Sequence, residues 1–259
     1  MGHLRLQKFP VTRRWSQVLT LLETNASTAA IAAASASAAK TALRAAAHDP
    51  VFEQAVWILV NAPIAARGPD FEEDLRSLGV ELNDDPTLVG ITSAVATALD
   101  HHGSQVGART DLGELAHTAL LETISAACAP RIDDLFGDQA NSARSLLASY
   151  SSGDRFAKLA RDFFARLTAK TLDTFLSRAL SDLVGVDRRF QTDFERRAFD
   201  AAFSNHCSET ARIVEEFAGG WYGKHLWQKG SFQRSDALKF GRYAITKLLK
   251  ELERRHGEG

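Results

Sequence analysis

The sequence predicts an all-α protein, an irregular bundle of about ten helices. Proline, which breaks helices, occurs only six times in 259 residues. Alanine and straight-chain side chains, which lose little rotamer freedom in a helix, are abundant, whereas β-branched residues are sparse. Apolar residues also recur at steps of three and four along much of the chain, which is the spacing of one helical face. An apolar fraction of 45% and a charged fraction of 24% are typical of a folded globular protein.

Capping patterns locate several helix starts. Asp49-Pro50 and Asp85-Pro86 each place a capping carboxylate before a proline, whose missing N–H costs nothing in the first turn. Asp111 and Glu114 have the spacing of a capping box. From these signals and the periodicity we expect helices over residues 12–24, 27–47, 50–66, 70–78, 86–101, 112–128, 138–150, 154–184, 189–218 and 235–255.

Two of these helices have distinctive compositions. Residues 154–184 carry a broad apolar face, so we expect this helix to be a central pillar of the C-terminal half. Residues 27–47 are dominated by alanine, with only Ile31 and Leu43 as larger apolar side chains. Such a helix either packs closely between neighbours or forms a weakly held outer helix, and we favour close packing.

The helical pattern is interrupted near residues 130–141, and charge is unevenly distributed along the chain. We predict two packed helical lobes, residues 1–135 and 136–259. The range 1–48 holds six basic and one acidic residue, 49–138 holds four basic and sixteen acidic, and 221–259 holds nine basic and four acidic. The basic ends could touch an anionic partner, or they could fold against the acidic middle of the same chain.

The C-terminal region contains the most distinctive passage. We expect Gly219-Gly220 to end the helix over 189–218 and to begin a glycine-rich connector containing aromatic residues and lysines. Aromatic and basic side chains together suit protein interfaces or stacking on nucleic-acid bases. Alternatively, the tryptophans fix the last helix to the bundle while its basic residues complement the helix dipole. The candidate partner- or nucleic-acid-binding residues are Trp221, Tyr222, Lys224, Trp227, Lys229, Arg234, Lys239, Arg242 and Lys250.

His206 is the candidate pocket residue. It falls in the apolar series Phe199, Phe203, His206, Thr210, Ile213 and Phe217, so we expect it on the inward face, with Cys207 pointing about 100° away. A core histidine with one hydrogen bond is the alternative to a titrating pocket group. Glu114 and His117 match half of a carboxylate–histidine metal motif, and we predict neither a metal site nor a cofactor. Cys128 and Cys207 match no disulfide or zinc spacing, which favours buried free thiols.

Three functional hypotheses follow. The run Glu216–Lys224 resembles segments of bacterial proteins, and this resemblance implies no activity. We expect a non-enzymatic helical subunit or adaptor of a bacterial multiprotein complex, which binds a protein partner through its aromatic and basic C-terminal region. The alternatives are a nucleic-acid-binding protein that uses both basic ends and a small-molecule-binding protein with a pocket around His206. No apolar run reaches the roughly 18 residues of a membrane span, so we predict a cytoplasmic location.

Overall fold

The computed structural model describes residues 12–82, 85–107, 110–129 and 139–256, and these residues form eleven helices and no strand. The all-α prediction is confirmed. The predicted lobe boundary near 130–141 falls mainly outside the described residues. The helices are α1 (Arg13–Glu23), α2 (Thr28–Ala46), α3 (Pro50–Arg67), α4 (Phe71–Ser77), α5 (Leu88–Gln105), α6 (Asp111–Ala127), α7 (Gln139–Ser149), α8 (Gly153–Ser181), α9 (Asp193–Thr210), α10 (Arg212–Lys229) and α11 (Arg234–His256).

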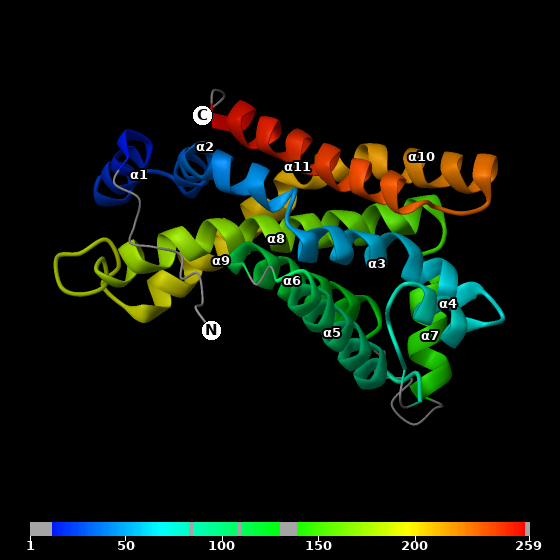
Figure 1. The fold of residues 1–259 in the computed structure, drawn as a ribbon. Coiled ribbons are helices and arrows are strands. Elements are labelled where there is room, and N and C mark those ends of the chain that lie inside the picture. The colour runs from blue at the N-terminus through cyan, green and yellow to red at the C-terminus, as the bar shows by residue number, and fades with distance from the viewer. Residues whose placement is uncertain (1–11, 83–84, 108–109, 130–138, 257–259) are drawn as a thin grey trace.

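Helix α8 is the centre of the bundle, as its periodicity predicted. It contacts α10, α6, α9 and α2, so that α10 and α11 lie on one side of it and α5 and α6 on the other (Figure 1). Its buried aromatic side chains Phe156, Phe163 and Phe164 contact Phe52 of α3 and Phe240 of α11. Aromatic rings bury a large area each, so this cluster joins helices from both halves of the chain.

The alanine-rich helix α2 is closely packed. Ile31, Leu43 and most of its alanines are buried, because α1 covers one side of the helix and α11 another. Small side chains allow this close approach on several faces. The prediction of close packing is therefore confirmed, and the weakly held outer helix is excluded.

Three predicted helix starts have different outcomes. Asp49 caps α3 as predicted, because its Oδ1 accepts hydrogen bonds from the backbone N–H groups of Val51 at 2.8 Å and of Phe52 at 3.1 Å. The other two predictions are wrong. Thr87 caps α5 in place of Asp85, and Thr110 caps α6 in place of Asp111. In both cases a threonine hydroxyl accepts the N–H group three residues ahead.

The single helix predicted over residues 189–218 is interrupted at Ala211. In an unbroken helix the carbonyl of Ser208 would accept the N–H group of Arg212. Here it accepts a hydrogen bond from the Arg161 Nε at 3.2 Å instead. Insertion of a side chain into the backbone ladder is a recognised cause of a helix kink. The interruption therefore has a tertiary cause, a side chain of α8.

The predicted glycine-rich connector is wrong, because α10 runs through Gly219-Gly220. A Cβ on Gly219 would lie 3.1 Å from the carbonyl oxygen of Gly153, so this glycine lets α8 and α10 approach backbone to backbone. The helix ends instead at Gly230, which adopts a left-handed conformation with φ 72° and donates its N–H to Leu226 O. Packing against α8 outweighs the low helix propensity of glycine.

The two predicted lobes pack extensively against each other. Helix α11 packs on α2 and α3, α7 packs on α3, and α8 packs on α6. The basic C-terminal end meets the acidic middle where Arg242 pairs with Glu53 at 2.6 Å, and the two basic ends meet each other where Lys40 pairs with Glu253 at 2.7 Å. Among the helices of the described ranges, none has the length and apolar character needed to cross a bilayer.

Candidate functional site

The structure separates the candidate aromatic residues into buried and exposed ones. Tyr222 is fully buried, stacked on Phe156 with ring centroids 3.9 Å apart, and its hydroxyl donates to the Val60 carbonyl at 3.1 Å. Burial raises the pKa of this phenol well above its ordinary value. Trp221 is half-buried and stacks on Phe240 at 4.4 Å. These two residues hold α10 to α8 and α11, in line with the stapling role considered above.

Trp227, in contrast to Tyr222, is highly exposed to solvent. It is 86% exposed, near the C-terminal end of α10. Gly220 and Gly223 precede it on the same side of the helix, and a Cβ on either would meet no atom within 4 Å. Each glycine in an exposed helix interior costs roughly 0.5–1 kcal/mol relative to alanine. Unlike Gly219, Gly220 and Gly223 therefore make no contact with the described residues that would require a glycine.

Three of the candidate basic residues have partners within the chain. Lys229 pairs with Asp236 at 3.2 Å, Arg234 donates to Gln54 Oε1 at 2.7 Å, and Arg242 pairs with Glu53 at 2.6 Å. Desolvation acts to raise the pKa of Asp236, but the hydrogen bonds from Lys229 and the Gln233 N–H lower it overall. These three basic side chains fasten α11 to α3 and α10, and carboxylates partly neutralise the charges of Lys229 and Arg242.

The remaining three basic residues are exposed lysines. Within the described part of the chain, no carboxylate pairs with Lys224, Lys239 or Lys250. On α11, Lys239 and Lys250 share a face with Tyr243, which is 48% exposed and contacts Phe217 of α10 with ring centroids 4.8 Å apart. We call Lys224, Trp227, Lys239, Tyr243 and Lys250 the α10–α11 face.

His206 is not on the inward line of α9. The buried residues of this helix are Phe199, Phe203, Cys207 and Thr210, so Cys207 points inward and His206 is only half-buried. This part of the prediction is wrong. Burial raises the pKa of the Cys207 thiol to about 12, which keeps the thiol protonated and unreactive. His206 lines neither of the two cavities described below.

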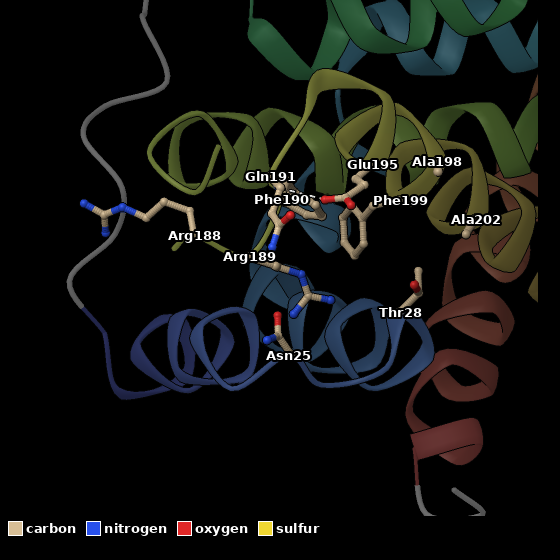
Figure 2. A pocket seen from close by; sticks show the side chains of 10 residues that line it. All are labelled: Asn25, Thr28, Arg188, Arg189, Phe190, Gln191, Glu195, Ala198, Phe199 and Ala202. Carbon is tan, nitrogen blue, oxygen red and sulfur yellow. Dashed lines mark hydrogen bonds between the residues drawn. The ribbon is translucent and has the colours of Figure 1, made fainter. Parts of the chain in front are cut away.

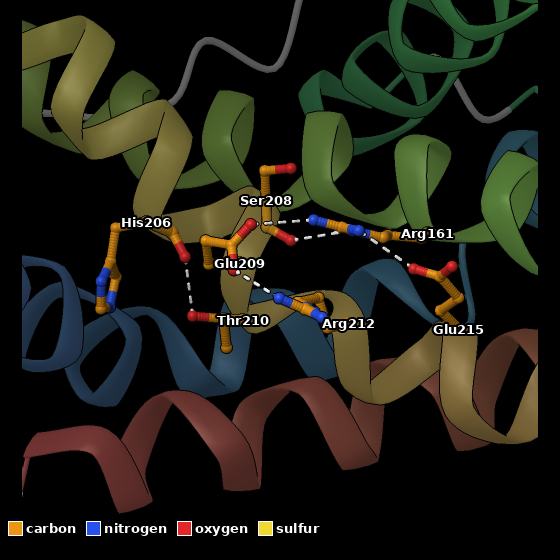
Figure 3. A network of polar contacts seen from close by, with 7 residues as sticks. All are labelled: Arg161, His206, Ser208, Glu209, Thr210, Arg212 and Glu215. Carbon is orange, nitrogen blue, oxygen red and sulfur yellow. Dashed lines mark hydrogen bonds and ion pairs between the residues drawn. The ribbon is translucent and has the colours of Figure 1, made fainter.

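A polar network surrounds the interruption between α9 and α10. Besides its bond to Ser208 O, Arg161 donates to Glu209 and to Glu215 at 3.0 Å each, and Arg212 donates to Glu209 at 3.2 Å. Figure 3 shows the ring of His206 on the far side of α9 from Arg161. The network thus joins α8 to both α9 and α10, and His206 meets it through its backbone carbonyl, which accepts a hydrogen bond from the Thr210 hydroxyl at 2.8 Å.

An open groove of about 570 Å³ lies between α9 and the α1–α2 connection (Figure 2). Its central cation, Arg189, donates to the carbonyl groups of Leu22 and Ala26 at 2.9 Å each. Its guanidinium also lies over the rings of Phe190 and Phe199. Arg189 therefore closes the C-terminal end of α1, and its charge is used within the fold.

The carboxylate–histidine pair predicted on α6 forms a single contact. His117 Nδ1 lies 3.8 Å from Glu114 Oε2. In the ranges that the structure describes, no group of three or more histidine, cysteine, aspartate or glutamate side chains is arranged to hold a metal ion.

Sequence reasoning missed two features. Tyr243 was not among the candidate residues, although its position four residues after Lys239 places it on the same helical face. A cavity between α8 and α9, described below, depends on side chains from two helices and has no signal in either segment alone. Comparisons with protein-family models, curated proteins and solved structures gave no match.

Proposed function

We propose that this protein is a helical adaptor that binds an acidic segment of a partner protein on the α10–α11 face. The observation that carries the proposal is Trp227, a tryptophan that is 86% exposed beside two glycines that no contact in the described part of the chain explains. Tryptophan is enriched among the residues that dominate binding energy at protein interfaces. The glycines leave room for the backbone of a partner segment beside the indole ring.

Charge indicates the chemistry of this partner. Lys224, Lys239 and Lys250 have no carboxylate partner in the described structure, so carboxylates of a bound segment would complement them. A protein fits better than a nucleic acid, because carboxylates such as Glu53 and Asp236 neutralise basic residues beside the face. Nucleic-acid binding depends on a continuous array of unpaired cations along the phosphate backbone.

The test compares two variants of equal charge change, each expressed as the tagged full-length chain. The face variant carries Lys224→Glu, Lys239→Glu and Lys250→Glu, and the control carries Arg13→Glu, Arg188→Glu and Arg197→Glu, all exposed elsewhere. We expect proteins that copurify with the wild type to be lost from the face variant and kept by the control. Trp227→Ala alone should weaken binding by at least about tenfold, the scale of an interface hot spot.

Two results would overturn the proposal. Equal recovery of every partner by the face variant and the control would show that the lysines are only solubilising. Loss of the partners after nuclease treatment of the wild-type sample would show that nucleic acid holds them. Circular dichroism of both variants checks that the helical fold is intact.

A further inference from the structure

A second site lies between α8 and α9, away from the α10–α11 face. A cavity of about 230 Å³ opens there, between residues of α8 from Ala169 to Leu180 and residues of α9 from Arg196 to Ser204. Its floor is apolar, because Leu176, Leu180, Phe199 and Phe203 line it, and neighbouring side chains cover most of the surface of each. For comparison, a cavity of about 150 Å³ holds a benzene ring. The space therefore suits a short alkyl chain.

The rim of the cavity carries four charged side chains, of which three are paired. Lys170 donates to Glu122 at 2.7 Å, and Arg196 contacts both oxygens of Asp200, at 2.9 and 3.1 Å. Asp173 is the exception. No hydrogen bond or ion pair from any described residue reaches its carboxylate.

Asp173 is exposed, yet its surroundings make its negative charge less favourable than that of a free aspartate. Although the side chain stands at the open rim, the neighbouring protein removes part of the water around the carboxyl group. This desolvation raises the pKa of Asp173, and the nearby Asp200 carboxylate raises it further. The cations Arg196 and Lys170 oppose the shift only in part, since each is bound to another carboxylate. A cation placed here would relieve an uncompensated charge.

We propose that this cavity binds a primary ammonium group carried on an alkyl chain. The ammonium group donates hydrogen bonds to the Asp173 carboxylate, and the alkyl chain lies on the floor formed by Leu176, Leu180, Phe199 and Phe203. Two sources carry this chemistry, a free alkylamine and the lysine side chain of a protein. The site is independent of the α10–α11 face, so the two proposals stand or fall separately.

The experiment measures binding to the protein by isothermal titration calorimetry with two small molecules and two peptides. These are n-hexylamine, n-hexanol as its uncharged analogue, and a short peptide with one lysine, compared with the same peptide carrying norleucine. We expect saturable binding of the amine, at least tenfold tighter than that of the alcohol. Tighter binding of the lysine peptide than of free hexylamine would identify a protein side chain as the source, and the reverse order a free amine.

Three variants test whether the amine binds in this cavity. Asp173→Asn should weaken amine binding at least tenfold, whereas Asp154→Asn, at the exposed start of the same helix, should leave it unchanged. Ser204→Leu, which fills the rim with a larger side chain, should block the amine without removing a charge. The proposal is overturned if hexanol binds as tightly as hexylamine, if neither amine probe saturates, or if Asp173→Asn binds hexylamine like the wild type.

Discussion

At the scale of single residues, side chains of one chemical type have different roles according to their partners. Tyr222 and Tyr243 are both tyrosines of the C-terminal helices, yet one is fully buried and the other is 48% exposed. Lys229 and Lys239 differ in the same way, because only Lys229 has a carboxylate partner among the described residues. Composition alone could not separate these roles, since it does not register which side chain meets a partner from another helix.

Tyr222 provides a test at this scale. In Tyr222→Phe the ring stack on Phe156 is kept, but the hydrogen bond to the Val60 carbonyl is lost. Because a buried hydrogen bond contributes about 1 kcal/mol net, we expect the free energy of unfolding to fall by about that amount. Urea denaturation followed by circular dichroism measures the change. A variant as stable as the wild type would show that water or another donor replaces the phenol.

At the scale of elements, periodicity predicted where most helices lie. The predictions that were wrong concern features that depend on contacts between helices. On α9 the residues Phe199, Phe203 and Thr210 are buried as the series predicted, whereas Cys207 is buried in place of His206. The end of α10 was misplaced because the contact between Gly219 and Gly153 is not visible in a single segment. The candidate basic residues could be predicted from the sequence, but which of them are paired depends on the packing of α11 on α3 and α10.

The two adjacent glycines of α10 give a matched pair of variants. Gly219→Ala should destabilise the protein, because its Cβ would lie 3.1 Å from the Gly153 carbonyl oxygen, and neither backbone can move away cheaply. Gly220→Ala should stabilise it by roughly 0.5–1 kcal/mol, since alanine favours the helix and its Cβ meets no atom. Thermal denaturation of both variants checks the opposite signs. If both changes stabilise the protein, the close approach of α8 and α10 is not tight.

At the scale of the whole molecule, the apolar core crosses between the two predicted lobes. Helix α11 covers α2 and α3, and α7 covers α3, so helices of the second range complete the burial of helices in the first. If either lobe were separated from the other, apolar side chains of its helices would be exposed to water. This packing couples the folding of the two halves.

We therefore expect the chain to unfold in one transition. Urea curves from far-ultraviolet circular dichroism, which reports all helices, and from tryptophan fluorescence should share one midpoint. Two separated midpoints would instead show that residues 1–135 and 136–259 are independent domains.

The exposure of Trp227 has a practical consequence for spectroscopy. Of the four tryptophans, Trp15 is buried, Trp57 and Trp221 are half-buried, and Trp227 is almost entirely in water. An aqueous quencher such as iodide should therefore act mainly on a single indole. The protein thus carries its own optical probe at the end of α10, and loss of quenching on adding a purified partner would reveal occupancy of that position without any label.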